Sequence, residues 1–343
     1  MSRLCLLLLM LATGCGAFAA PGYDGPRSDH FDGSTFINQK EEAPASLGEL
    51  LTWLFTRETG PWERRTSASQ RYPRPPARVG NGELRVTFIG HATLLVQFDG
   101  VNVLTDPVYS DRVTPVGGVG PRRFVPPGVA FDDLPPIDAI VISHNHYDHL
   151  DLPTLRAVYR RDFPTVFAGL GNARLLRENG LTRSVELDWW QSRRHRGLEF
   201  VAVPAQHFSG RGLIDRDATL WVGWVLRSPR AGTVYFAGDT AMGPHFQQIR
   251  NRFGRPRLAA LPIGAYLPRW FMSRVHIDPA QAVEAHRILG AQTSVGVHFD
   301  TFALADEAQG QAPRDLAKAM RKHGVADDAF LVLDFGEGRD ISP

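Results

Sequence analysis

The sequence predicts an α/β fold in which sheets are covered by helices on their outer faces. From residue 83 onward, short apolar and β-branched runs alternate with helix-like segments, and this alternation is typical of layered sheets and helices. The 33 glycines and 25 prolines supply many turns, which suit such a fold better than a helical bundle. At 343 residues and 43% hydrophobic content, the chain is long enough to bury a sizeable core.

Composition also excludes several classes of protein. The chain has 38 basic and 36 acidic side chains and a net charge of +2, so it lacks the positive excess of a dedicated nucleic-acid-binding protein. It is too apolar for a disordered protein. No apolar run reaches the roughly 18–20 residues of a membrane-spanning helix. We therefore expect a folded protein with no nucleic-acid partner.

Residues 1–20 have the pattern of an export signal. Arg3 is followed by the apolar stretch 4–12 and then by small residues, which is the order of a secretory leader too short to span a membrane. Two processing sites are open. Ala12-Thr13-Gly14-Cys15 resembles a bacterial lipobox that would make Cys15 an acylated first residue, and Ala17-Phe18-Ala19 resembles an ordinary A-x-A site. We favour the lipobox, because Cys15 stands where acylation requires a cysteine.

This leader predicts a protein of the bacterial cell envelope, either an outer-membrane lipoprotein or a periplasmic protein. Cys5 and Cys15 are the only cysteines, and both lie in the leader. The mature chain can therefore form no internal disulfide and no cysteine-based zinc site. Any metal site must use histidines and carboxylates.

Residues 21–82 are predicted to form a linker followed by an amphipathic extension. The stretch from Pro21 to about Ala45 is polar and reads as the linker, whereas Ser46-Leu47-Gly48-Glu49 is a capping box that opens a helix. One apolar stripe follows on that helix, made of Leu47, Leu50, Leu51, Leu54 and Phe55. Six arginines come next: Arg57, Arg64, Arg65, Arg71, Arg74 and Arg78. Either the stripe enters lipid and the arginines bind lipid phosphates, or the helix docks on the protein's own core. We favour the docked helix, because most such helices in soluble domains face inward.

Residues 83–343 are expected to form one catalytic domain. Strands are predicted at 84–89, 93–98, 101–105, 137–143, 164–168, 185–189, 200–204, 220–226, 233–237, 258–263, 294–298 and 330–335. Helices are predicted at 152–161, 172–179, 245–253, 279–289 and 314–323. Asp99-Gly100 is a hairpin turn signal between two of these strands, and the unbroken apolar run at 137–142 indicates a buried strand.

The segment after that buried strand carries the strongest functional signal. His144, His146, Asp148 and His149 lie within six positions, and neutral imidazoles and carboxylates are good ligands for Zn²⁺ and related ions. Alternation along the strand end points His144 and His146 the same way, and a turn then brings Asp148 and His149 to a neighbouring point. Such a cluster can serve two metal ions a few ångströms apart, as two-metal hydrolysis requires.

Three later residues complete a candidate metal centre. His207, Asp239 and His298 each follow an apolar strand, so a common sheet edge would gather them. Each alone is an ordinary loop residue as readily as a ligand. Together with the first cluster they give five histidines and two aspartates, enough for two metal ions with open positions.

These residues resemble the metallo-β-lactamase superfamily, with its H-x-H-x-D-H cluster and later His, Asp and His. Further segments resemble the N-acyl-phosphatidylethanolamine phospholipase D family: Gly90-His91-Ala92-Thr93, Leu104-Thr105-Asp106-Pro107, Pro135-Pro136-Ile137-Asp138-Ala139, Leu187-Asp188-Trp189-Trp190, Pro262-Ile263-Gly264-Ala265-Tyr266, Pro268-Arg269-Trp270-Phe271-Met272, His276-Ile277-Asp278-Pro279 and Thr301-Phe302-Ala303-Leu304-Ala305. The resemblance covers roughly residues 84–335. It implies an αββα sandwich of the metallo-β-lactamase type.

The resemblance also implies two zinc ions per chain and their ligands. His144, His146 and His207 would hold one zinc ion, and Asp148, His149 and His298 the second. Asp239 would bridge the two ions. Every one of these positions holds the residue type that the family has there.

Four neighbouring residues are given supporting roles. Asp148 is interpreted both as a ligand and as the hydrogen-bond partner of the attacking water. His276 is a candidate for binding the substrate phosphate or delivering a proton, and stands equally well as an ordinary residue before a helix. Tyr147 either points into the site or packs beneath it, and Asp106 is expected to orient a ligand.

The chemistry expected of such a centre is metal-assisted hydrolysis. A water between two zinc ions ionises near neutral pH and can attack a phosphodiester phosphorus, releasing an alcohol and leaving a phosphomonoester. The resemblance implies a phospholipid substrate at a membrane surface, with N-acyl-phosphatidylethanolamine giving phosphatidic acid and N-acylethanolamine. Five residues would line an acyl-chain groove or, as we favour for most of them, the core: Trp189, Trp190, Trp270, Phe271 and Met272.

Three alternatives stay open at this point. The same type of centre hydrolyses lactones, β-lactams or sugar phosphates in other proteins. A nuclease is disfavoured by the leader and by the near-neutral charge. A non-catalytic envelope protein of this fold would usually lack ligands, and none is missing here.

Overall fold

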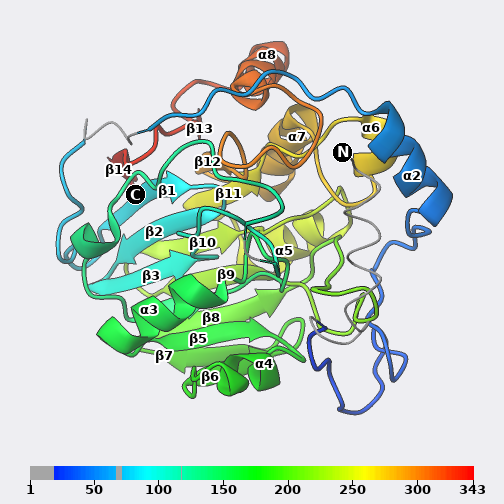
Figure 1. Ribbon diagram of the computed structural model, residues 1–343. Coiled ribbons are helices and arrows are strands. Elements are labelled where there is room, and N and C mark those ends of the chain that lie inside the picture. Colours follow the sequence, from blue (N-terminus) through cyan, green and yellow to red (C-terminus); the bar gives the residue numbers. More distant parts are fainter. Residues whose placement is uncertain (1–18, 67–71, 117) are drawn as a thin grey trace.

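The computed structural model describes residues 19–66, 72–116 and 118–343, and the predicted leader with Cys5 and Cys15 lies outside them up to residue 18. Within the described residues two sheets of seven strands each face one another (Figure 1). The first has the order β14-β1-β2-β3-β4-β5-β6 and the second β13-β12-β11-β10-β9-β8-β7. With helices on the outer faces, this is the αββα sandwich that the resemblance implied, and the predicted fold class is confirmed.

The bounds of the elements are as follows. The first sheet contains β1 (Leu84–Gly90), β2 (Thr93–Phe98), β3 (Val101–Thr105), β4 (Ala139–Val141), β5 (Thr165–Gly169), β6 (Ser184–Leu187) and β14 (Gly338–Asp340). The second contains β7 (Ser192–His195), β8 (Leu198–Val203), β9 (Gly223–Ser228), β10 (Gly232–Phe236), β11 (Leu258–Pro262), β12 (Thr293–Val297) and β13 (Phe330–Leu331). The helices are α2 (Leu47–Thr56), α3 (Leu152–Asp162), α4 (Ala173–Glu178), α5 (His245–Phe253), α6 (Arg269–Met272), α7 (Pro279–Leu289) and α8 (Gln311–His323), with a short 3₁₀ helix at Phe131–Asp133.

The strand pairing decides which chain segments meet at one edge of the sandwich. Strands β3, β4, β5 and β6 run parallel in the first sheet, and β10, β11, β12 and β13 run parallel in the second. Parallel neighbours end at the same edge of their sheet. The segments that follow β4, β10 and β12 therefore come together there.

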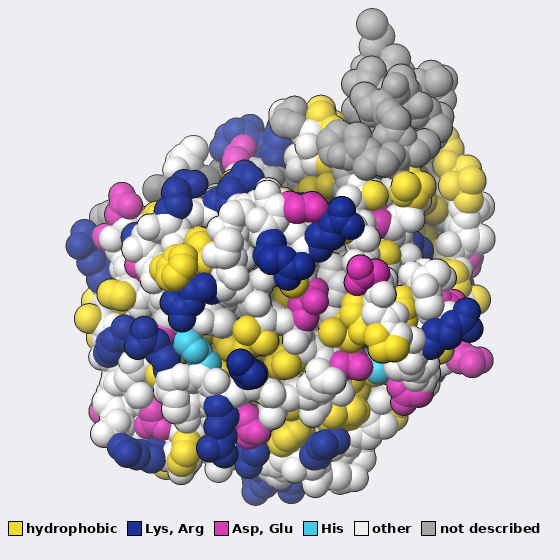
Figure 2. Space-filling view, turned by 90° about the horizontal axis from the view of Figure 1, so that it is seen from below, with side chains coloured by type: hydrophobic (Ala, Val, Ile, Leu, Met, Phe, Trp, Pro, Cys, Tyr) yellow, Lys and Arg dark blue, Asp and Glu magenta, His cyan; other side chains and the backbone are white. Residues whose placement is uncertain are grey.

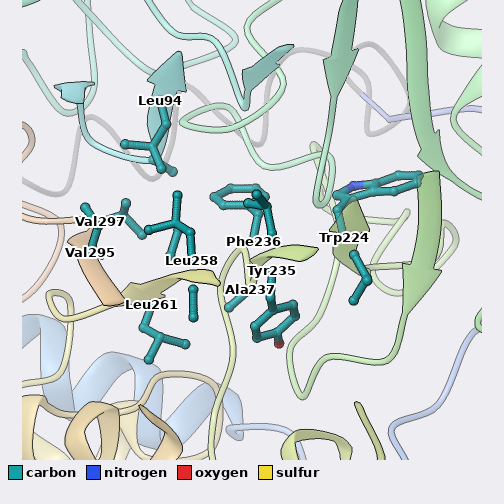
Figure 3. Close-up of a cluster of buried hydrophobic side chains, with 14 of the residues drawn as sticks. Leu94, Trp224, Tyr235, Phe236, Ala237, Leu258, Leu261, Val295 and Val297 are labelled. Atoms are coloured by element: carbon teal, nitrogen blue, oxygen red, sulfur yellow. The ribbon is translucent and has the colours of Figure 1, made fainter. Parts of the chain in front are cut away.

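The core lies between the two sheets (Figure 3). Leu94 of β2 points across the gap toward Phe236 and Leu258 of the second sheet, and all three are buried. Tyr235 and Leu261 alternate to the opposite side of that sheet, as the period of a strand requires. The first sheet's outer face is covered by α3, whose Leu155 belongs to a second buried cluster.

Edge strands account for most differences from the predicted elements. The polar segment of β7 shows no apolar alternation and gave no signal, yet it pairs with β8 along its whole length. The short β14 pairs with β1 in the same way. The strand predicted at 137–143 is restricted to Ala139–Val141, and the one predicted at 330–335 to Phe330–Leu331. The Asp99-Gly100 turn is confirmed, with positive φ at both residues.

The prediction of a linker before residue 46 is wrong. Phe31 is 1% exposed and Phe36 is 2% exposed, and both belong to the main core cluster. Asn38 exchanges hydrogen bonds with the backbone of His207. We call residues 20–44 the N-terminal strap; it loops along the lower right edge of the molecule in Figure 1. The aromatic rings anchor the strap because they fill space that the sheets leave open.

Helix α2 begins with the predicted capping box, in which Ser46 and Glu49 bond each other's backbone amides. The predicted stripe is not its buried face. Trp53 is the buried residue, stacked on Phe271 of α6 at 4.9 Å, whereas Leu47 is 71% and Phe55 is 72% exposed. The helix thus docks on the protein mainly through Trp53, with Leu54 packed beside it and Glu49 paired with Arg274, and leaves much of its apolar stripe in solvent.

The arginines after α2 bind the protein's own carboxylates. Arg57 pairs with Asp306, Arg74 with Asp133 and Arg78 with Asp138, so they fasten the extension to the domain instead of leaving a free cationic row. Arg71 lies outside the described residues. Figure 2 shows basic, acidic and hydrophobic side chains interspersed on the face seen from below. No helix in the described part of the chain is long and apolar enough to cross a bilayer.

Candidate metal centre

The structure gathers all seven predicted ligands at the edge where the parallel strands end. The loop after β4 carries His144, His146, Asp148 and His149, and the segments after β8, β10 and β12 carry His207, Asp239 and His298. Their candidate ligand atoms fall into overlapping groups, and within each group all of these atoms lie within 4.8 Å of one another. The sheet topology therefore converts residues spread over the sequence into one cluster.

Asp239 stands at the centre of this cluster. Its Oδ2 lies 3.2 Å from His149 Nε2, 3.1 Å from His298 Nε2 and 3.8 Å from His207 Nε2. The residue is 4% exposed. A carboxylate that faces imidazoles from both halves of the cluster is in position to bridge two cations.

Asp148 forms the centre of the second half. Its Oδ2 lies 3.3 Å from His149 Nε2 and 3.4 Å from His298 Nε2. His91 also reaches this oxygen, with its Nε2 at 2.9 Å. The other half contains His144, His146 and His207, and His144 Nε2 lies 2.8 Å from His146 Nδ1.

Neighbouring groups fix the orientation of the imidazoles. Asp106 Oδ2 accepts a hydrogen bond from His149 Nδ1 at 2.7 Å and from Ser143 Oγ at 2.5 Å. His207 Nδ1 donates to the carbonyl oxygen of Val275 at 2.9 Å. Both bonds hold the ring so that Nε2 faces the cluster with its lone pair, which is the usual arrangement of a metal-binding histidine. Asp106 therefore lies where it was expected to orient a ligand.

The cluster holds buried polar atoms that the protein itself leaves unpaired. Nε2 of His149, His207 and His298 and Oδ1 of Asp239 have no hydrogen-bond partner and almost no exposure to solvent. Buried polar groups are normally satisfied, and an unpaired one costs roughly 1–3 kcal/mol. These three imidazole nitrogens and one carboxylate oxygen are of the kinds that bind metals, and their lack of partners fits a site for a pair of divalent cations.

Electrostatics bring several of these groups to the protonation state that a metal needs. Burial lowers the pKa of His207 to about 3 and that of His146 to about 4, so both rings are neutral near pH 7. Burial alone would raise the pKa of Asp239, but His149 and His298 hold it well below its usual value. Asp239 and Asp148 in turn outweigh burial and raise the pKa of both rings, that of His298 to about 9, so a bound cation would take the place of a proton on each of them. Neutral imidazole and ionised carboxylate are the metal-binding forms.

The two residues with open roles differ in position. His276 Nδ1 lies 3.9 Å from Asp239 Oδ2, and its ring centroid is 5.1 Å from that of His207, so it borders the metal centre. The guanidinium carbon of Arg211 lies 3.9 Å from the centroid of the Tyr147 ring. Tyr147 also packs with Val108 and Phe302. Of the two placements considered for Tyr147, the structure shows the packed one.

A cavity of about 940 Å³ leads away from the centre. His207 and His276 line this cavity. Its other lining residues are Leu50 and Trp53 of α2, Phe271 and Met272 of α6, residues 35–38 and 40–44 of the strap, Ala45, Phe208, Trp221, Val275 and the charged Arg216, Asp217 and Arg274. Of the five aromatic and methionine residues weighed as a groove, only Phe271 and Met272 line it. Trp189 is buried and stacks on His30, Trp190 packs near Phe253, and Trp270 is 47% exposed.

Comparison with known proteins decides the family. Residues 101–299 match the model of the β-lactamase superfamily domain. The chain is 36% identical over 268 residues to "N-acyl-phosphatidylethanolamine-hydrolyzing phospholipase D 1" of Caenorhabditis elegans, over 74% of this chain and 75% of that protein. The chain belongs to the metallo-β-lactamase superfamily and to its N-acyl-phosphatidylethanolamine phospholipase D-like family. It is a metal-dependent hydrolase of this fold.

One further sequence relative and one solved structure are also similar to this chain. An uncharacterised protein of Mycobacterium tuberculosis is 44% identical over 316 residues, which cover 89% of this chain and 81% of that protein. The solved structure of a possible metal-dependent hydrolase from Veillonella parvula has a TM-score of 0.60 at 18% identity, covering 75% of this chain and 99% of that one. The latter shows the shared fold alone.

The sequence does not predict two parts of the site that the structure shows. A single histidine after β1 has no spacing partner, so the sequence gives His91 no role. In the structure His91 has a left-handed backbone (φ 56°), and its Nε2 lies 2.9 Å from Asp148 Oδ2. The strap wall of the cavity was also missed. The polar sequence of residues 35–45 carries no signal that we could have used.

Proposed function

We propose that the protein hydrolyses N-acyl-phosphatidylethanolamine-type phospholipids to phosphatidic acid and N-acylethanolamine. One observation carries this proposal: the cavity joins the metal centre at His207 and His276 to apolar residues of α2 and α6. A phosphodiester with long acyl chains needs such a combination, with cations at the phosphate and an apolar wall for the chains. The relatives named for this activity support the same substrate class.

Zinc is the metal that we propose for the two positions. The donor set of imidazole nitrogens and carboxylate oxygens, without a cysteine, suits Zn²⁺ in a catalytic site. His144, His146 and His207 would hold one ion, Asp148, His149 and His298 the other, and Asp239 both. Such a pair supplies an ionised water near neutral pH and neutralises charge on the phosphate.

The chain's own residues position the substrate and the water. Asp148 would accept a hydrogen bond from the attacking water, and its Oδ2 lies 2.9 Å from His91 Nε2 and 3.4 Å from His298 Nε2, which fixes the carboxylate. Burial lowers the pKa of His276 to about 3, so its ring is neutral and suited to donating a hydrogen bond to a phosphate oxygen. The apolar part of the cavity wall, which includes Leu50, Trp53 and Phe271, would shield the acyl chains from water.

Direct assay tests this function. The purified protein is offered N-acyl-phosphatidylethanolamine, phosphatidylcholine, a lactone and a chromogenic β-lactam. We expect N-acylethanolamine release only from the first lipid, abolished by His144→Ala and by Asp239→Asn although both variants fold. EDTA should inactivate the protein and Zn²⁺ should restore it. Equal turnover by wild type and both variants would refute the assigned site, and exclusive turnover of the β-lactam would refute the substrate.

We also propose that the protein meets its substrate at a membrane surface. The docking patch comprises Leu47, Leu50 and Phe55 of α2 and Trp270 of α6, which are 71%, 36%, 72% and 47% exposed. In Figure 1 these two helices lie together at the right edge of the molecule. Leu50 also lines the cavity, so the patch adjoins the place where acyl chains would enter. Clustered exposed apolar side chains mark interaction sites.

A vesicle-binding experiment tests the patch. Leu47→Asp combined with Phe55→Asp should weaken sedimentation with phospholipid vesicles at least tenfold without lowering the melting temperature, because both side chains are largely in solvent. Phe163→Asp, 51% exposed at the end of α3, is the matched control and should bind vesicles like wild type. Equal binding by all three proteins would contradict the patch while leaving the hydrolase assignment intact.

A further inference from the structure

Asp215 is a buried carboxylate that binds three backbone amides. The residue is 3% exposed. Its Oδ2 accepts hydrogen bonds from the amides of Arg211 at 2.9 Å and Ala20 at 2.7 Å, and its Oδ1 accepts one from Gly212 at 2.7 Å. Among the described residues no basic side chain forms an ion pair with it. The guanidinium of Arg211 interacts with it electrostatically without a direct ion pair, and a buried carboxylate is costly without a directly paired cation.

The amide of Ala20 comes from the far end of the chain. Ala20 directly follows the A-x-A motif at Ala17-Phe18-Ala19, whose first two residues lie outside the described part. From Ala20 onward the chain is docked: Ala20 is 7% exposed, and the amide of Tyr23 bonds the carbonyl of Ala218 at 2.8 Å. The motif therefore ends where the packed strap begins.

We propose that a leader peptidase hydrolyses the Ala19–Ala20 bond and that the new α-ammonium group of Ala20 forms a buried ion pair with Asp215. Water adds across the peptide bond, so that Ala19 leaves with a carboxylate and Ala20 keeps the amino group. That group takes up a proton near neutral pH, since a free α-amino group titrates at about 7.7–8.0. The hydrogen bond at 2.7 Å, in which only the carboxylate carries charge, then becomes an ion pair.

The ion pair would stabilise a loop that supports the metal centre. Asp215 holds the backbone of Arg211, whose guanidinium donates to the carbonyls of Asn145 and Leu150, both at 2.8 Å. These carbonyls flank the segment that contains His146, Asp148 and His149. Removal of the leader would thus add an ion pair to Asp215, which is connected to the metal-binding loop through Arg211.

The competing site predicts a different N-terminus. Processing at the lipobox would leave Cys15 as an acylated first residue, and Ala20 would keep a neutral peptide amide. To distinguish the two, the full chain with its leader is produced in an exporting bacterium, and the mature protein is analysed by N-terminal sequencing and intact mass. A chain that starts at Ala20 supports the proposal. An acylated Cys15 or a retained Met1 overturns it.

A double-mutant cycle tests the ion pair itself. Gly-Ser inserted between Ala19 and Ala20 leaves the cleavage motif intact but moves the charged amino group away from Asp215. We expect the insertion to lower the melting temperature by roughly 2–6 °C in the wild-type background and hardly at all with Asp215→Asn. An equal shift in both backgrounds would overturn the ion pair. If the Asp215→Asn protein cannot be produced in folded form, the insertion in the wild-type background still tests the ion pair. An unchanged melting temperature for that variant would contradict it.

Discussion

Asp106→Asn is predicted to weaken metal binding without disturbing the fold. Asp106 is fully buried and accepts the Nδ1 proton of His149 at 2.7 Å, which leaves Nε2 of that ring free to bind metal 3.2 Å from Asp239. The other oxygen, Oδ1, accepts the backbone amide of Ser143 at 2.7 Å. An asparagine that keeps this bond with its oxygen presents its NH₂ group to His149 Nδ1. The ring must lose this bond or move its proton to Nε2, where the metal binds.

The size of the effect follows from the role of such supporting bonds. Loss of an outer partner of a metal-binding histidine typically lowers metal affinity about 10–100-fold, which corresponds to about 1.4–2.7 kcal/mol. The backbone of Asp106 is left-handed, with φ 34°, and asparagine tolerates this region as well as aspartate does. The substitution therefore changes the hydrogen bond and not the chain path.

The assay is competition for Zn²⁺ between the protein and a chromophoric chelator. Asp138→Asn is the matched control: Asp138 is 6% exposed just before β4, at the end opposite the metal centre, and binds the amide of Asn102 and the side chain of Arg78. We expect the control to lower stability and leave zinc affinity unchanged. Wild-type affinity in Asp106→Asn, or an equal loss in both variants, would refute the reasoning.

Three further predictions follow from individual residues. His91→Gln should reduce zinc content toward one ion per chain by elemental analysis, because Asp148 loses the partner at 2.9 Å; two ions at wild-type affinity would contradict this role. Phe31→Ala should lower the free energy of unfolding by about 3–5 kcal/mol in urea titrations, since the ring is 1% exposed; a loss below 1 kcal/mol would restore the linker interpretation. His30→Gln should lower the melting temperature more at pH 6 than at pH 9. Burial lowers the pKa of His30, but hydrogen bonds to Asp188 and Asp29 outweigh burial and raise the pKa. Folding therefore favours the protonated ring, and the stability that this ring contributes is lost as the pH rises through the folded-state pKa. A melting-temperature difference that does not change with pH would contradict this role of His30.

The metal centre was predictable because strand ends and ligand residues coincide in the sequence. His207, Asp239 and His298 each follow an apolar run. The parallel strands β10, β11 and β12 bring Asp239 and His298 to one edge, and β8 ends at the same edge because two antiparallel pairings separate it from β10. His91 was not predictable in this way, because its contact with Asp148 depends on a backbone turn with φ 56° that no local pattern announces.

The N-terminal region shows where sequence patterns stop being informative. Phe31 and Phe36 are isolated aromatics in a polar stretch, so nothing in the local sequence indicates that the sandwich provides a site for them. In α2 the periodic stripe suggested the wrong buried face. Trp53 is buried instead because Phe271 of α6 lies opposite it, and that partner comes from more than two hundred residues away.

The central proposal is that seven side chains, Asp239 and six others around it, would hold two metal ions at which a lipid phosphodiester is hydrolysed. Turnover of N-acyl-phosphatidylethanolamine in ¹⁸O-labelled water, followed by mass spectrometry of both products, tests it most directly. The account predicts one ¹⁸O atom in phosphatidic acid, none in N-acylethanolamine, and no labelled product with Asp239→Asn. Label in a released fatty acid, or undiminished labelling with Asp239→Asn, would contradict it.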